Sequence, residues 1–281
     1  MRMEDLDPDR SRPEYATAAL EDLRWLGMDW QEGPDVGGPF APYEQSLRHQ
    51  IYLAAWEKLQ QGGFIYPCRC SRKDLAAALS APHEGKQRDA DPLDDEPVYP
   101  GTCRPPAIIP TELPGSPTGW NWRFRVHDRE AIEFEDLNLG RQRFVAGLDF
   151  GDFVIWRRDR PASPRTHGVP SEPGLLAGVR TDPRPWGSGV PSYQLACVAD
   201  DATMQITEVV RGADLLKSTA RQILLNRALG FRDPVWYHCG LIVDNNGRRL
   251  AKRHDDLSIG TLRNRGLSPA EVLAGDLNLY I

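Results

Sequence analysis

The chain has 281 residues, of which 40% are hydrophobic and 26% are charged, and its formal net charge is -6. This length can bury a core and suits one large domain or two modest ones. The acidic balance argues against a protein that coats nucleic acid, so an RNA partner would need a local basic face. Apolar runs stay well short of the roughly 18 residues of a membrane span, which predicts a cytoplasmic protein without membrane contacts. Five cysteines, two of them one residue apart, favour metal-bound or free thiols in a reducing compartment.

Two helices are predicted in the first 62 residues. Ser11 is suited to cap the first helix, with Pro13 in its first turn, and apolar residues then recur with a helical period until Gly27. A second amphipathic helix is expected from Ser46 to a Gly-Gly pair, and the segment FIYP after it reads as a short strand.

Later segments predict a sheet. Residues 120–127 alternate between apolar and polar side chains, which is typical of a half-buried strand. Further strands are expected at DFVIW, SYQLACVA, MQITEVV and WYHCGLIV, with a helix from Ser218 to Leu229 between the last two. Strands separated by helices favour an α/β fold.

Two segments read as insertions. Residues 80–98 are polar and nearly free of large apolar side chains, which predicts a mobile loop. Residues 159–189 are rich in proline and repeat the phrase GVPS, so a flexible surface excursion is expected. The arginines of this second segment offer RNA contacts as the less favoured interpretation.

A group of cysteines provides a candidate metal site. Cys68 and Cys70 form a C-x-C pair, and Cys103 follows after a loop. Three thiolates can hold tetrahedral zinc with one further ligand, for which Tyr99 is the candidate; free cytosolic thiols are an equally weighted alternative. Cys197 and Cys239 lie in apolar segments and are expected to be core residues.

The segment SYQLACVADDATMQITEVVRG contains a candidate anion site. Tyr193 and Arg211 are expected at the ends of adjacent strands, where a guanidinium can receive a carboxylate. A surface ion pair of Arg211 with Asp200 or Asp201 is the alternative, and the sequence does not separate the two.

A basic segment, DNNGRRLAKRHDD, follows the last predicted strand. It contains Arg249, Lys252 and Arg253, and such a loop can close over a polyphosphate and neutralise its charge. A solvated basic turn is the alternative, and composition alone favours it.

Taken in order, these motifs resemble the class I glutamyl-tRNA synthetases, especially their short paralogue that modifies the queuosine base of tRNA(Asp). The resemblance rests on RMEDLDPDRSR, YPCRCSR, YPGTCR, the segment around Arg211 and RRLAKRHDD. It implies an α/β fold with a Rossmann-like nucleotide-binding core at 1–66 and 190–281. It also implies an inserted, acceptor-binding-like zinc subdomain at 67–158, followed by the flexible insertion at 159–189.

The resemblance also implies a reaction. Glutamate would be activated by ATP, with Mg²⁺, as glutamyl-adenylate and transferred to queuosine in tRNA(Asp) by a monomeric enzyme. Glu4 would hold the α-amino group of glutamate, with Tyr193 and Arg211 around its side chain and carboxylate. One structural zinc would be bound by Cys68, Cys70, Tyr99 and Cys103.

The basic loop corresponds to the family's ATP-clamping loop. Lys252 would be the catalytic, phosphate-facing lysine, flanked by Arg249 and Arg253 on ATP. Arg249 replaces a lysine of the family pattern and Ala251 replaces a serine, so one hydroxyl donor is absent.

In this family the RMED motif follows about forty residues that include a first strand and an H-x-G-H helix. We therefore expect residue 1 to lie inside a domain and the 281-residue chain to form glutamyl-adenylate slowly. Alternatives to the queuosine-directed enzyme are a fragment of a glutamyl-tRNA synthetase that charges tRNA(Glu) and an inactive remnant that binds zinc or RNA.

Overall fold

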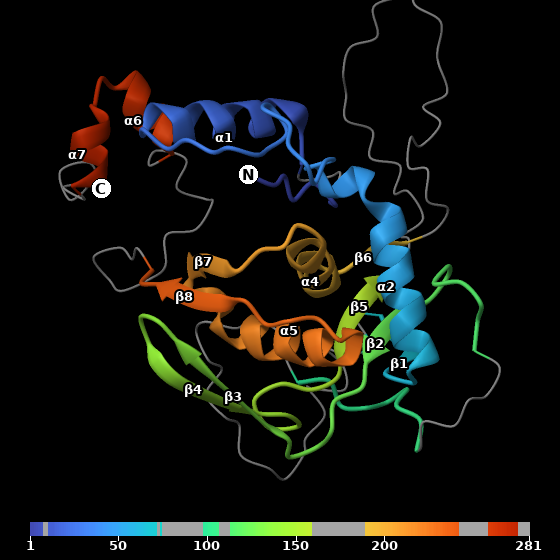
Figure 1. Cartoon of the computed structure of the whole chain (residues 1–281). Helices are drawn as coiled ribbons and strands as arrows, with labels where there is room; N and C mark the ends of the chain where they lie inside the picture. Colours follow the sequence, from blue (N-terminus) through green and yellow to red (C-terminus); the bar gives the residue numbers. More distant parts are fainter. Residues whose placement is uncertain are drawn as a thin grey trace, which may run out of the picture.

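The computed structural model describes residues 1–7, 11–71, 74, 98–106, 113–158, 189–241 and 258–274 (Figure 1). Helices and strands are interspersed along these residues, which confirms the predicted α/β class. The helices are α1 (Pro13–Trp25), α2 (His49–Gln61), α4 (Tyr193–Thr203), α5 (Leu216–Leu229), α6 (Ile259–Asn264) and α7 (Pro269–Leu273), with short 3-10 turns η1 (Gln45–Leu47) and η2 (Ala213–Leu215).

The strands form two four-stranded sheets. One is antiparallel with the order β1-β2-β5-β6, and the other has the order β4-β3-β8-β7. In the second sheet β7 runs parallel to β8 with Arg211 opposite His238, while β3 meets β8 in parallel at Asp136 opposite Trp236. The strands are β1 (Ile65–Cys68), β2 (Asn121–Phe124), β3 (Ala131–Asp136), β4 (Gly140–Val145), β5 (Phe153–Arg157), β6 (Val190–Pro191), β7 (Glu208–Gly212) and β8 (Val235–Cys239).

A single hydrophobic core connects α2, α4 and α5 with both sheets. Trp56 of α2 meets Trp122 of β2 edge to face, with ring centroids 4.9 Å apart, and both rings are fully buried. Leu195 of α4 and Leu225 of α5 are buried in the same core. Close packing in this core holds α2, α4 and α5 in fixed positions.

The segment SYQLACVA is helical, and its prediction as a strand is wrong. Residues 193–203 form α4, and the Ser192 hydroxyl caps it by accepting from the Leu195 N–H at 3.5 Å. The residues from 195 to 200 are all buried, and the first five of them, LACVA, form a short continuous apolar run. Such a short apolar run cannot be told from a buried strand by pattern.

Several boundaries differ from prediction for identifiable reasons. The second helix begins at His49, because the Ser46 N–H and hydroxyl both donate to the Asp5 carboxylate and do not cap it. The first helix is capped at Arg12 and not at Ser11. The strand predicted at 120–127 covers only Asn121–Phe124, and on its polar side Arg123 is buried while Asn121 is half-buried.

The remaining predicted elements agree with the structure in part or fully. The helix expected from Ser218 is α5, DFVIW contains β5, and WYHCGLIV contains β8, while MQITEVV becomes extended only at Glu208. The expected insertions at 80–98 and 159–189 lie outside the described residues except at their ends. Among the described helices, none combines the length and apolarity needed to cross a membrane.

Candidate active site

A groove of about 910 Å³ opens between the first residues of the chain, α4 and β7. It is lined by all three side chains predicted to surround glutamate, namely Glu4, Tyr193 and Arg211, and also by Arg2 and Cys197. The structure therefore brings together residues that are more than 180 positions apart in the sequence. Its volume suits a small-molecule ligand.

The first residues are held beside the groove by backbone hydrogen bonds. The Met3 N–H donates to the Tyr43 carbonyl at 2.8 Å, and the Gln45 N–H donates to the Met3 carbonyl at 3.0 Å. Side chains alternate along extended backbone, so Arg2 and Glu4 share the side opposite Met3 and face the groove.

Charges of both signs line the groove. Arg2 donates to Asp201 at 2.6 Å and to Glu4 at 3.1 Å, so Glu4 is paired but remains 44% exposed. Burial raises the pKa of Tyr193 and that of Cys197 above their ordinary values, so both side chains are neutral at physiological pH. A neutral Tyr193 can donate its O–H to an anionic ligand.

Arg211, at the end of β7, is anchored by three hydrogen bonds. Its Nε donates to His238 at 3.1 Å, Nη1 donates to the Gln222 side-chain oxygen at 2.9 Å, and Nη2 donates to the Thr219 hydroxyl at 2.6 Å. A guanidinium has five N–H donors, so these bonds leave one on each Nη. Two parallel N–H groups match a carboxylate.

The predicted placement of Tyr193 and Arg211 at the ends of adjacent strands is wrong, because Tyr193 is the first residue of α4. The alternative of a surface ion pair of Arg211 with Asp200 or Asp201 is also wrong, because Asp200 is buried and Asp201 pairs with Arg2 at 2.6 Å. Asp200 is on the buried side of α4, where it accepts from Arg48 Nε at 2.6 Å, from Gln45 at 2.8 Å and from the Tyr52 hydroxyl at 2.9 Å.

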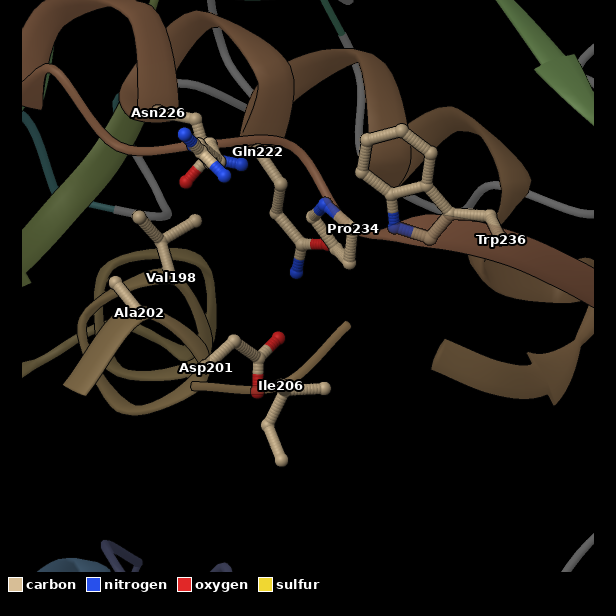
Figure 2. Close-up of a pocket in the computed structure, with 9 residues that line it drawn as sticks. Val198, Asp201, Ala202, Ile206, Gln222, Asn226, Pro234 and Trp236 are labelled. Carbon is tan, nitrogen blue, oxygen red and sulfur yellow. The ribbon is translucent and has the colours of Figure 1, made fainter. Parts of the chain in front are cut away.

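A second, much smaller cavity of about 10 Å³ is lined by residues of α4, α5 and β8 and holds at most one water molecule. Figure 2 shows Asp201 of α4 and Gln222 of α5 directed into it from opposite sides. The Gln222 amide nitrogen has no hydrogen-bond partner among the described residues. A water here would join the amide to the Asp201 carboxylate; the cavity is too small for a substrate.

The three cysteines and the tyrosine predicted as zinc ligands converge on one point, where the three thiol sulfurs lie within 4.8 Å of one another. Cys70 Sγ lies 3.5 Å from Cys103 Sγ, and the Tyr99 hydroxyl is 3.5 Å from Cys68 Sγ and 3.6 Å from Cys70 Sγ. A tetrahedral zinc with bonds of about 2.3 Å places sulfurs about 3.8 Å apart. The residues therefore fit a zinc ion.

Arg123 provides positive charge beside this cluster. Its Nε donates to Cys68 Sγ at 3.4 Å, and its guanidinium stacks on the Tyr99 ring at 3.7 Å. The side chain is 4% exposed, which overturns its predicted place on a solvated face of the strand. A buried guanidinium offsets the negative charge that several thiolates would concentrate there.

Two other predicted features are the basic loop and Cys197. Arg249, Lys252 and Arg253 of the basic loop lie outside the described residues. Cys197 is a buried residue as expected, yet it is on a helix and its Sγ lies 3.6 Å from the Glu4 carboxylate.

Sequence reasoning did not select Asp136 or His238 as site residues. The signal for His238 was present, because it is a polar residue in the apolar run VWYHC. Asp136 ends its strand beside a turn, where an aspartate is unremarkable. Only the fold brings these two residues behind Arg211.

Comparison with known proteins agrees with this geometry. A model of the family "tRNA synthetases class I (E and Q), catalytic domain" matches residues 1–95 and 186–278. The chain belongs to this family, and the predicted enzyme class, an aminoacyl-tRNA synthetase-like ligase, is confirmed.

Individual relatives extend the match along the chain. The glutamyl-Q tRNA(Asp) synthetase of Symbiobacterium thermophilum is 44% identical over 97% of this chain and 73% of its own length. Glutamate--tRNA ligase 2 of Nitrosococcus oceani is 39% identical over 96% of this chain and 49% of its own length. The crystal structure of glutamate-tRNA synthetase from Elizabethkingia anophelis aligns with a TM-score of 0.63 at 25% identity, over 95% of this chain and 46% of that one. The chain thus spans about half the length of these last two proteins.

Proposed function

We propose that the groove binds L-glutamate and that the protein activates it with ATP as glutamyl-adenylate. The observation that carries this proposal is the convergence of Glu4, Tyr193 and Arg211 on one groove. Glutamate presents one ammonium and two carboxylates. Glu4 matches the ammonium, and the anchored fork of Arg211, with the Tyr193 O–H nearby, matches a carboxylate.

In the proposed reaction an α-carboxylate oxygen of glutamate attacks the α-phosphorus of ATP. A new P–O bond forms, the bond to the β-phosphate oxygen breaks, and pyrophosphate leaves with its electron pair. Groove residues contribute by holding the amino acid so that this carboxylate faces the nucleotide. Lys252, with Arg249 and Arg253, is assigned to the phosphates, where cations stabilise the growing negative charge.

We assign the queuosine base of tRNA(Asp) as the acceptor. This finer assignment is supported by the Symbiobacterium relative, which is named for that activity and is matched over 73% of its length. Charging of tRNA(Glu) is the second candidate, because ligases with that general name match at 39% identity.

The acceptor can be tested with radiolabelled glutamate, ATP and three purified tRNAs, using the protein expressed from its complete gene. We expect label on tRNA(Asp) that contains queuosine and none on the same tRNA without it or on tRNA(Glu). Glutamate-dependent ATP–pyrophosphate exchange without tRNA tests the activation step separately. Label on tRNA(Glu) alone would favour the second candidate, and an absence of exchange would refute activation.

Cys68, Cys70, Tyr99 and Cys103 are proposed to hold one structural zinc. Four protein donors would close a tetrahedral shell, which is typical of a structural site and leaves no position for substrate. When bound, the ion would cross-link the loop at 99–103 to the end of β1 and so stabilise this part of the fold.

Metal analysis tests this site directly. Purified protein should contain about one zinc per chain, and Cys103→Ala should lose most of it and unfold at lower temperature. Cys239→Ala is the matched control, because it removes a thiol outside the cluster and should leave the metal content unchanged. Equal zinc in the wild type and Cys103→Ala would rule out the proposed ligand set.

A further inference from the structure

Behind Arg211 lies a buried pair formed by Asp136 and His238. The His238 Nδ1 is 2.6 Å from Asp136 Oδ2, and both side chains are fully buried. On the opposite edge of the ring, Nε2 accepts from Arg211 Nε at 3.1 Å and lies 3.2 Å from the Thr219 hydroxyl. Asp136, His238 and Arg211 thus form a continuous hydrogen-bonded series.

This arrangement determines which ring nitrogen carries the proton. A carboxylate only accepts, so Nδ1 must donate to Asp136. Arg211 Nε only donates, so Nε2 must be unprotonated. Asp136 therefore selects the single neutral tautomer that can hold Arg211.

The other oxygen of Asp136 keeps the carboxylate itself in place. Oδ1 accepts from the backbone N–H groups of Asn138 at 3.1 Å, Leu139 at 2.9 Å and His238 at 3.3 Å. These bonds join the turn after β3 to β8. The series that ends at Arg211 is therefore anchored on the backbone of two strands.

We propose that Asp136 and His238 are positioning residues for amino-acid recognition, which orient the guanidinium of Arg211 toward the carboxylate of the substrate in the groove. The inference rests on the proposed function for the identity of that substrate. Without the His238 acceptor, a buried Arg211 N–H is unsatisfied and the guanidinium can rotate about its long side chain. Precise placement of a binding group is worth up to about 100-fold.

The pH dependence of glutamate affinity provides one test of this proposal. Burial lowers the pKa of His238 below 6.5, and the Arg211 charge acts in the same direction, against the opposing effect of Asp136 on β3 and Asp214 on η2. The ring is therefore neutral near pH 7. Protonation of Nε2 would place two donors opposite each other, so we expect glutamate affinity to fall as the pH drops through the lowered pKa of His238. Glutamine in place of His238 should remove this step.

Three substitutions distinguish a positioning role of Asp136 and His238 from a role in folding. Asp136→Asn keeps an oxygen for the backbone N–H groups but donates to Nδ1, which forces the wrong tautomer. His238→Asn retains a donor toward Asp136 but has no acceptor for Arg211, whereas His238→Gln keeps an oxygen at the distance of Nε2. We expect Asp136→Asn and His238→Asn to weaken glutamate binding by about 10- to 100-fold and His238→Gln to weaken it less.

The matched control is Glu133→Gln, the same chemical change at an exposed position of β3, which should not alter glutamate affinity. Binding of a non-hydrolysable ATP analogue should be unchanged in all four variants. Glutamate affinity that is equal in wild type, Asp136→Asn and His238→Asn would overturn the inference.

A measurement of the His238 tautomer tests the positioning role of Asp136 and His238 even if glutamate is not the substrate. The chain has six histidines, so ¹⁵N-histidine spectra are sparse, and His238→Gln identifies the relevant signals. At pH 7.5 His238 should show a protonated Nδ1 and a bare Nε2, and Asp136→Asn should reverse this. A wild-type Nε2–H tautomer or a charged ring would overturn the positioning role. Failure of wild-type protein to bind glutamate, with the expected tautomers, would instead count against the proposed function alone.

Discussion

Replacement of Asp200 by alanine should lower the free energy of unfolding by about 3–5 kcal/mol. The carboxylate is fully buried and receives hydrogen bonds from Arg48, Gln45 and Tyr52. Its removal leaves the Arg48 guanidinium, only 2% exposed, without its counter-charge. An uncompensated buried charge is among the most costly defects that a single substitution can introduce.

The same substitution should disturb the groove. Arg48 also donates to the carbonyls of Phe40 and Pro42 and to the Thr203 hydroxyl, so it ties the 40–42 loop to the end of α4. Because α4 carries Tyr193, loosening this helix should weaken glutamate binding too.

Urea denaturation followed by tryptophan fluorescence measures the loss of stability. Glu133→Ala is the control, since it breaks an exposed ion pair with Arg141 and should leave stability nearly unchanged. If Asp200→Ala unfolds at the same urea concentration as wild type, the hydrogen-bond network around Asp200 of α4 does not hold the fold together.

Replacement of Arg211 by alanine should weaken glutamate binding by more than about 100-fold. The guanidinium is the cation that α5 and β8 anchor at the groove, through Thr219, Gln222 and His238. A charge-assisted bidentate bond to a carboxylate contributes more than a neutral hydrogen bond, and alanine removes it entirely.

Lysine at position 211 should recover little affinity. It keeps the charge but has no planar fork, and it cannot satisfy its three anchors while presenting two parallel N–H groups to a ligand. Arg143→Ala, on β4, is a charge-matched control outside the groove. Equilibrium binding of glutamate to the four proteins compares them, and full affinity in Arg211→Lys would show that charge alone is recognised.

Sequence patterns predicted the helix at α5, which ends at a glycine in the left-handed conformation, and the strands at β5 and β8. They failed at α4, where the short continuous apolar run at 195–199 suits a buried strand as well as a helix. Local patterns report on neighbours along the chain. They do not report how deeply a segment lies in a core.

Some residues of the candidate site could likewise be predicted from the sequence, and others could not. Cys68, Cys70 and Cys103 were found because metal ligands have characteristic spacings, and Arg211 because an arginine at a strand end is a recognisable feature. The residues that support Arg211 were not predicted. Asp136 and His238 are 102 positions apart and meet only through the pairing of β3 with β8.

Calorimetric titration with L-glutamate tests the central claim most directly. Glu4 and Arg211 both line the groove, and they offer partners of opposite charge for the ammonium and for a carboxylate of glutamate. We predict saturable binding of one L-glutamate per chain, with L-aspartate, shorter by one methylene, and L-glutamine, which has lost the second carboxylate, at least about tenfold weaker. Saturable binding of all three with equal affinity, or no binding of glutamate, would contradict the assignment of the groove.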